Sequence, residues 1–278
     1  MAYVKPSEFA AQMIEAGEAK VFMSTKDTLI RAYMAGAILA LAAAFAVTIA
    51  VNTGNFLVAS LLFPVGFCML YLLGFDLLTG VFTLAPLALL AKRPGVTWGG
   101  VLRNWGLVFV GNFAGALTTA VFMAIIFTMG FSQEPNAVGQ KIGKIGEART
   151  LGYAAAGAAG MLTVFIRAVM CNWMVSTGVV AAMMSSTVSG KIMAMWMPIL
   201  VFFYLGFEHS IVNMFLFPSG IMLGGQFTWF DYLAYNELPV ILGNVVGGLT
   251  FVGGMIYATH FKTSPSRRPV GIVAEPAE

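Results

Sequence analysis

Midway through an apolar stretch, residues 192–224, stands the sequence Gly206-Phe207-Glu208-His209. A second apolar stretch, residues 56–91, is interrupted in the same way by Gly74-Phe75-Asp76. A helix that spans a bilayer needs roughly 20 apolar residues, so each stretch is too long for one ordinary span and too short for two. We therefore predict that each stretch forms one crossing of two half-helices. The loop that joins them at membrane depth must be buried in protein or line a cavity.

The composition indicates that this chain needs a bilayer around it. Of its 278 residues, 59% are hydrophobic and only 10% are charged, and the mean hydropathy is +0.86. A soluble domain carries about 25% charged residues. The net charge of +3 gives no reason to expect a nucleic-acid partner. The sequence has no Gly-rich phosphate loop, metal-ligand spacing or Ser-His-Asp set, so we expect neither an enzyme nor a cofactor.

Four further stretches are apolar enough to span a membrane unbroken: residues 32–51, 105–129, 154–183 and 238–259. With the two interrupted stretches they make six spans. If the N-terminus lies inside, the outer loops hold only Lys141, Lys144 and Arg149, and most other basic residues lie inside. This distribution agrees with the positive-inside rule. We predict a multi-pass protein of a bacterial-type inner (plasma) membrane with both termini in the cytoplasm.

The two interrupted stretches are matching parts of a repeat. Their interruptions lie 132 positions apart, and residues 31–34 echo residues 167–170 at an offset of 136. Further pairs share the offset of 132: Pro86 and Pro218, Asn104 and Asn236, Gly111-Asn112 and Gly243-Asn244, Gly115 and Gly247, Leu117 and Leu249. Each half holds three spans, so the second half enters from the opposite side. The prediction is an all-α membrane protein with six transmembrane helices, an inverted 3+3 repeat and broken second and fifth helices, an arrangement that points to a permeation site.

We expect one transmembrane domain over residues 1–262, with repeat one at about 27–130 and repeat two at about 154–262. Residues 6–20 place Phe9, Met13 and Ala16 on one helical face, which predicts an amphipathic helix on the inner membrane surface. Residues 263–278 hold three prolines and are predicted to form a disordered cytoplasmic tail.

Ionisable residues in the interruptions are the first functional candidates: Asp76, Glu208 and His209. Such groups are costly in a membrane unless they are paired, so function is the default hypothesis. Asp76 and Glu208 either line a cation path or accept hydrogen bonds from backbone N–H groups freed at the breaks. We favour the second role because the two residues match across the repeat. His209 is either a core histidine bonded to a carbonyl or a functional residue, and we favour function because it follows the repeat-matched acid.

Three neutral polar residues lie near the interruptions: Thr79, Asn172 and Asn213. Alone, each is typical of helix packing in membranes. Aromatic residues accompany them, with Phe63 and Phe67 before the first interruption and Phe202 before the second. In that company the three polar residues are candidates for the polar centre of an apolar pore.

Three motifs resemble those of the formate/nitrite transporter family, over nearly the whole chain. They are Asp76-Leu77-Leu78-Thr79-Gly80 followed by Lys92-Arg93 and Asn104-Trp105, then Cys171-Asn172-Trp173-Met174-Val175, then residues 206–215. The resemblance implies an aquaporin-like six-helix protomer in a lipid bilayer and a homopentamer with one pore per protomer. It also implies permeation of small monovalent anions such as formate, nitrite, hydrosulfide or short carboxylates. Residues 79–80 and 84–86 are more similar to formate-associated members.

The resemblance also assigns roles to residues. A loop histidine and a loop threonine face each other at the pore centre in the family, and these roles fall on His209 and Thr79. The family asparagine of the fourth span falls on Asn172. The apolar constrictions fall on four residues: Phe63, Phe67, Leu77 and Phe202.

One position departs from the family pattern. Ala156 stands where many members carry a lysine in the outer vestibule. Lys144 and Arg149 lie upstream. Either they take over the attraction of anions, or that attraction is weaker here.

The resemblance and the buried charges together predict a mechanism. A bare anion is costly to desolvate in an apolar pore, so a weak-acid anion crosses after it is protonated, with His209 as donor or relay. The alternative is a channel for a small neutral solute such as ammonia or hydrogen sulfide, which the acidic loops and Ala156 leave open. A membrane scaffold that transports nothing is a third reading, and the broken helices argue against it.

Overall fold

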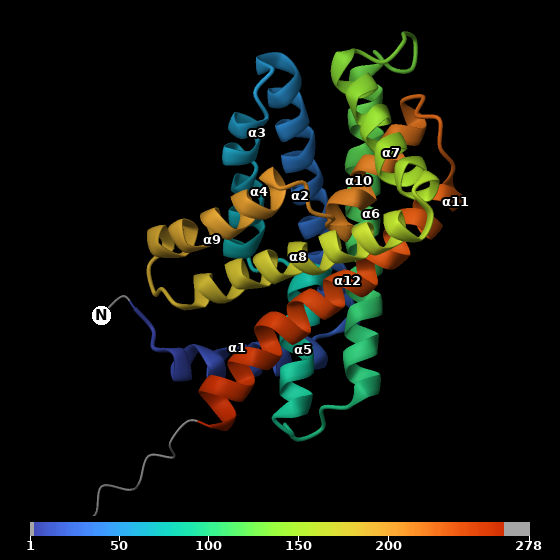
Figure 1. The fold of residues 1–278 in the computed structure, drawn as a ribbon. Helices are drawn as coiled ribbons and strands as arrows, with labels where there is room; N and C mark the ends of the chain where they lie inside the picture. Colours follow the sequence, from blue (N-terminus) through green and yellow to red (C-terminus); the bar gives the residue numbers. More distant parts are fainter. Residues whose placement is uncertain (1–2, 264–278) are drawn as a thin grey trace, which may run out of the picture.

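The computed structural model describes residues 3–263, and helices account for most of them (Figure 1). The predicted tail, residues 263–278, lies outside the described part except for its first residue. The α-helices are α1 (Pro6–Phe22), α2 (Thr25–Thr53), α3 (Phe56–Leu62), α4 (Pro64–Leu72), α5 (Leu78–Leu90), α6 (Trp98–Phe127), α7 (Ala137–Ala155), α8 (Gly157–Met183), α9 (Val188–Tyr204), α10 (Ser210–Met222), α11 (Trp229–Tyr232) and α12 (Leu238–Gly248). Three segments of the long helix that contains α12 are π-helical: η1 (Leu233–Glu237) before α12, and η2 (Leu249–Gly254) and η3 (Tyr257–Lys262) after it.

Four helices in this part of the chain are long and apolar enough to cross a membrane: α2, α6, α8 and the continuous helix Trp229–Lys262 that contains α12. They carry large apolar side chains on the outside, such as Phe122 (60% exposed) and Leu242 (62% exposed). In Figure 1, α2 and α6 run nearly vertically, whereas α8 runs close to horizontally and α12 runs diagonally. So much exposed apolar surface is stable against lipid or another protein and is costly in water.

Both predicted interruptions are present in the structure. In the first, α4 ends at Leu72 and α5 begins at Leu78; in the second, α9 ends at Tyr204 and α10 begins at Ser210. Gly74 (φ 72°) and Gly206 (φ 66°) adopt the left-handed conformation that ends each preceding helix. The first half has an additional break at Pro64, which separates α3 from α4 because proline lacks the N–H of a continuous helix.

In each half, one asparagine side chain stabilises the break in that half. Asn112 donates to Ala32 O (2.8 Å) and Asp76 O (2.9 Å) and accepts from Leu78 N (2.9 Å). The contacts with Asp76 O and Leu78 N satisfy backbone groups that the break removes from the helical ladder, and the contact with Ala32 O ties the break to α2.

Asn244 makes the matching contacts in the other half. It donates to Ala168 O (2.8 Å) and Glu208 O (3.0 Å) and accepts from Ser210 N (3.1 Å). The partners differ from those of Asn112 by 136 positions in α8 and by 132 in the loop and α10, which are the two offsets found in the sequence.

Close helix contacts also match between the halves. A Cβ atom on Gly115 would lie 1.9 Å from Tyr33 O, and one on Gly247 would lie 2.2 Å from Val169 O. Glycine therefore allows α6 to pack on α2, and α12 on α8, with their backbones nearly touching.

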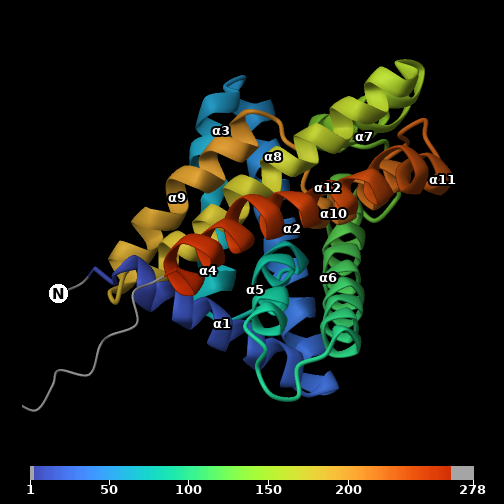
Figure 2. The same ribbon diagram turned by 60° about the horizontal axis from the view of Figure 1, so that its bottom comes forward.

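The matching extends to α1 and to α7, a helix that the sequence analysis did not predict. Asn104 Nδ2 donates to Lys20 O on α1, and Asn236 Nδ2 donates to Arg149 O on α7, both at 3.0 Å. The apolar face of α1 is buried beside α5, with Met13 fully buried, and α1 lies below α8 in Figure 1 and is also labelled in the turned view of Figure 2. Each half therefore begins with a helix that packs against its own broken segment, α1 against α5 and α7 against α10.

Candidate functional site

The two breaks meet at one contact between side chains. Thr79 lies in the first turn of α5, and its Oγ1 is 3.3 Å from Nε2 of His209, the residue before α10. Thr79 is fully buried and His209 is 2% exposed. The structure thus brings together the two residues that the family resemblance assigned to the pore centre.

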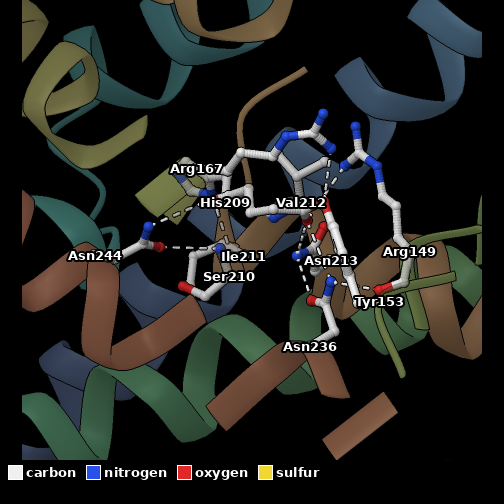
Figure 3. A network of polar contacts seen from close by, with 11 residues as sticks. Arg149, Tyr153, Arg167, His209, Ser210, Ile211, Val212, Asn213, Asn236 and Asn244 are labelled. Atoms are coloured by element: carbon white, nitrogen blue, oxygen red, sulfur yellow. Dashed lines mark hydrogen bonds and ion pairs between the residues drawn. The ribbon is translucent and has the colours of Figure 1, made fainter. Parts of the chain in front are cut away.

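His209 also caps α10 (Figure 3). Its Nδ1 accepts from Ile211 N at 3.1 Å and from Val212 N at 3.3 Å. A nitrogen that accepts two backbone hydrogen bonds carries no proton, so the proton of the neutral ring is on Nε2. That N–H points toward Thr79, while the Phe202 ring stacks on the imidazole at 5.6 Å between centroids.

A cavity of about 560 Å³ opens on one side of this contact. We call it the α7-side cavity, and residues from α2, α3, α7, α9, α10 and the loops beside them line it: Ala43, Ala46, Val47, Ala50, Val51, Gly54, Phe56, Lys141, Ile145, Ala148, Arg149, Phe202, Phe203, Phe207, His209, Val212 and Leu216. Its walls are mainly apolar, and its two cationic residues, Lys141 and Arg149, both come from α7.

A smaller cavity of about 260 Å³, the α1-side cavity, lies on the other side. Its lining is Ala16, Lys20, Phe67, Leu70, Tyr71, Gly74, Phe75, Asp76, Leu77, Gly80, Val81, Leu84, Val179 and Met183. Leu77 and Gly80, which flank Thr79 in the chain, belong to this lining, whereas His209 belongs to the other. The Thr79–His209 contact therefore separates the two cavities.

The Glu208 side chain lies in a dense polar network behind the histidine (Figure 3). It is fully buried, and Tyr153 Oη donates to its Oε1 at 2.8 Å. Its Oε2 accepts from Asn213 (3.0 Å) and Asn236 (3.3 Å) and lies 3.5 Å from Arg149. All four neighbours of the carboxylate are hydrogen-bond donors or cations, as a buried anion requires.

Arg167 reaches this network through a tyrosine. Its Nη1 donates to Tyr153 Oη at 2.8 Å, and that hydroxyl in turn donates to Glu208. Burial, with the adjacent Glu208 carboxylate, raises the pKa of Tyr153 to about 12, so the phenol stays protonated and remains a donor. Arg149 therefore contacts the Glu208 carboxylate directly, and Arg167 is linked to it through the Tyr153 hydroxyl.

Asp76 makes simpler contacts than Glu208. Its Oδ1 lies 2.5 Å from Lys20 Nζ on α1, and its backbone oxygen accepts from Asn112. Each acidic residue thus fastens its loop to a short helix by an ion pair, Asp76 to α1 and Glu208 to α7.

Thr79 itself lines neither cavity, and three further predicted pore residues lie away from the cavity walls. Asn213 belongs to the Glu208 network, and Asn172 donates to Thr79 O at 3.1 Å from behind α5. Phe63 is fully buried and stacks on Phe203 at 3.9 Å between centroids. None of the three lines either cavity. Of the proposed constrictions, Phe67 and Leu77 line the α1-side cavity and Phe202 lines the α7-side cavity.

Sequence reasoning missed the partners of Glu208, chiefly Tyr153 and the whole of α7. The repeat-matched Asn104–Asn236 pair was the available signal, because these asparagines bind the short helices. Within residues 3–263, no group of three or more His, Cys, Asp or Glu side chains is placed to hold a metal ion.

Comparison with known proteins identifies the family. The formate/nitrite transporter family model matches residues 7–258. A probable formate transporter of Methanothermobacter thermautotrophicus is 38% identical over 213 residues, covering 74% of this chain and 76% of its own. A formate channel of Bacillus thuringiensis is 33% identical over 275 residues, covering 94% and 98%.

Two solved structures share the fold. One is a pentameric formate channel with formate bound (TM-score 0.71, 23% identity, covering 86% of this chain and 98% of that one). The other is an ion channel of the same family (TM-score 0.76, 23% identity, covering 91% and 98%). Together with the family match over most of its length, these relatives show that the chain belongs to the formate/nitrite transporter family.

Proposed function

We propose that this protein is a membrane channel for formate and similar small monovalent weak-acid anions, including nitrite, hydrosulfide and short carboxylates. The observation that carries the proposal is the pair of apolar cavities that meet at the Thr79–His209 contact. The match to a relative named as a formate channel extends over nearly the whole length of both proteins, which supports formate as the substrate.

The proposal includes the architecture. The four long helices and the two broken segments form six spans in an aquaporin-like inverted repeat, supported by the matched contacts of Asn112 and Asn244. The protomers assemble as a homopentamer in a bacterial-type inner membrane, with both termini in the cytoplasm. The pentameric neighbour and the distribution of basic residues support these two points.

Transport begins with attraction of the anion. Arg149 and Lys141 line the α7-side cavity, and we assign them the task of the vestibule lysine that Ala156 replaces. Arg149 is only 25% exposed, and its partner Glu208 is shared with Arg167 through Tyr153. The surplus positive charge in this network favours an anion in the adjacent cavity.

The charge of the substrate must then be neutralised. The walls formed by Phe202, Leu77 and Phe67 make the charged form costly and so favour the protonated acid. His209 cannot take a second proton while its Nδ1 caps α10, because two hydrogen bonds would be lost beside the positive end of a helix. We therefore assign the proton to cavity water, and His209 assists by offering its Nε2–H to an oxygen of the acid.

The same contact also suits a small neutral solute, such as ammonia or hydrogen sulfide, because a neutral imidazole between apolar walls does not need an anion. Competition separates the two candidates. Labelled-formate uptake that excess ammonium leaves unchanged, and that excess unlabelled formate abolishes, supports the acid channel. The opposite pattern supports the neutral-solute channel.

The test is uptake of labelled formate by proteoliposomes over a pH series, for the wild type and for His209→Asn. Asparagine retains a good N-cap and therefore the start of α10, but it has no donor in the place of Nε2. We expect the rate to fall roughly three- to tenfold, the value of one hydrogen bond, with a changed pH profile. An unchanged rate and profile would remove His209 from the mechanism.

A further inference from the structure

A chain of buried polar side chains stands behind Thr79. Asn172 on α8 donates to Thr79 O at 3.1 Å and to Asn244 O at 2.6 Å. Its Oδ1 accepts from the Ser176 hydroxyl at 3.1 Å, and Ser176 Oγ lies 2.5 Å from Thr83 Oγ1 on α5. These side chains are fully buried and line neither cavity. This row of hydrogen-bonded side chains therefore links α5, α8 and α12 without lining either cavity.

The other half of the repeat has no such chain. The offsets of 136 and 132 place Gly36, Ala40 and Phe215 at the positions of Asn172, Ser176 and Thr83. Ala40 and Phe215 are fully buried, and a Cβ on Gly36 would lie 2.1 Å from a backbone oxygen of α6. The same helix packing is thus achieved there with apolar groups alone. Hydroxyl groups are not needed to build this contact, so their presence beside α5 calls for another reason.

The geometry indicates what the polar chain holds. Thr79 and Thr83 are one turn apart on α5, so Asn172 fixes the backbone of the first turn and Ser176 fixes a side chain of the second. Two fixed points set how far the start of α5 is rotated about its own axis. That rotation decides where the Thr79 hydroxyl lies relative to His209 Nε2, now 3.3 Å away.

The α12 backbone closes over the chain. A Cβ on Gly248 would lie 2.5 Å from Asn172 Nδ2 and from Thr83 Oγ1, and 2.8 Å from Ser176 Oγ. Glycine at this position therefore lets the α12 backbone lie directly against the three polar side chains. A fully bonded buried network of this kind is rigid.

We propose that Ser176 and Thr83 are positioning residues that hold the Thr79 hydroxyl opposite His209. They act through Asn172 and the first turns of α5, and they do not touch the permeating acid. The inference rests on the function proposed for the Thr79–His209 contact. Removing the Ser176 or Thr83 hydroxyl, which lies outside the cavities, should therefore change the rate and pH dependence of uptake in the same way as removing the Thr79 hydroxyl.

The first experiment measures labelled-formate uptake per folded protein across a pH series. Ser176→Ala and the isosteric Thr83→Val are expected to lower the rate roughly three- to tenfold and to shift the pH profile in the same direction as Thr79→Ala. Thr83→Ser retains the hydroxyl and is expected to keep the wild-type profile. Thr119→Val is the matched control, because this buried threonine of α6 bonds only Ala37 O, at 3.3 Å, away from both cavities.

The second experiment is a double-mutant cycle. If Ser176 acts through Thr79, adding Ser176→Ala to Thr79→Ala slows uptake no further, whereas independent effects multiply. Multiplying effects, or single variants with a wild-type pH profile and merely less folded protein, overturn the inference. If Ser176→Ala does not reconstitute, Thr83→Val provides the same readings. A wild type that takes up no formate refutes the proposed function, and a wild type that does, with unaltered variants, refutes only this inference.

Discussion

The two loops that interrupt the spans are residues 73–77 and residues 205–209. Their backbones are stabilised in the same way, but their side chains differ. Asn112 and Asn244 bind equivalent backbone groups at the two breaks. Around them, Asp76 has one ion pair, with Lys20, whereas Glu208 has four donors. The position of His209 corresponds to that of Leu77 at the offset of 132. Groups shared by both loops build the breaks, and groups found in one loop only build the site.

The largest expected effect comes from the shared asparagines. Asn244→Ala and Asn112→Ala each leave one loop carbonyl and one N–H at the break without a partner, at about 1–3 kcal/mol for each group, and each also removes a hydrogen bond to a carbonyl inside a neighbouring helix. We expect both variants to lose 3 kcal/mol or more and to lose similar amounts. Thermal unfolding in one detergent measures this, with the exposed Asn52→Ala as the control, expected within about 0.5 kcal/mol of the wild type. A mild loss in only one variant would show that the breaks are not equivalent.

The two asparagine variants are expected to lose similar amounts of stability, whereas variants of the two acidic residues are expected to lose different amounts. Glu208→Gln removes the buried carboxylate that pairs with Arg149 and accepts from Tyr153, the partner of Arg167, a change that costs about 3–5 kcal/mol. Asp76→Asn is expected to cost about 1 kcal/mol, because Lys20 is 18% exposed and can turn to water in its cavity. The same unfolding experiment tests the order. Equal losses would mean that the richer network around Glu208 adds no stability.

Glycine contacts give a third, smaller test. Gly115→Ala and Gly247→Ala each push a methyl group against a backbone oxygen of the neighbouring helix, and both are expected to cost about 1–3 kcal/mol. Gly106→Ala on α6 meets nothing within 4 Å, and alanine is the better helix former, so it is expected to stabilise the protein by up to about 1 kcal/mol. Destabilisation by Gly106→Ala equal to that of Gly115→Ala would show that helix approach is not the cause.

The backbone plan was largely predictable from the sequence, because it depends on patterns that repeat. The two interruptions, the offsets of 132 and 136, and the meeting of Thr79 with His209 all follow from the spacing of glycine, asparagine and acidic residues or from the family motifs. The break at Pro64 was not predicted, although proline supplies its cause.

The side-chain partners were not predictable in the same way. Asn213 and Phe63, both predicted pore residues, line neither of the two cavities: Asn213 donates to Glu208, and Phe63 stacks on Phe203. Which face of a helix meets the cavity depends on the packing of α7 and α9, and sequence spacing does not carry that information. The helix α7 was missed because its composition is polar enough to resemble a loop, with Lys141, Lys144 and Arg149 among its residues.

The smallest expected effect sharpens the difference between the two cavities. Lys141 lines the α7-side cavity, and Lys144 lies one turn further along the same helix without lining it. Charges in a cavity with apolar walls act on an incoming anion more strongly than charges facing solvent. We expect Lys141→Gln to lower formate uptake about twofold at low salt and Lys144→Gln to leave it unchanged.

High salt is the control for this last prediction, because counterions screen exposed charges within about 3 Å at 1 M ionic strength. The effect of Lys141→Gln should then disappear, while the effect of His209→Asn, which acts inside the protein, should remain. Equal effects of the two lysines would assign anion attraction to the surface charge of α7 as a whole. The α1-side cavity offers the converse case, since its Lys20 is already paired with Asp76 and contributes no net charge there. The lining charges thus favour the anion on one side of the contact only.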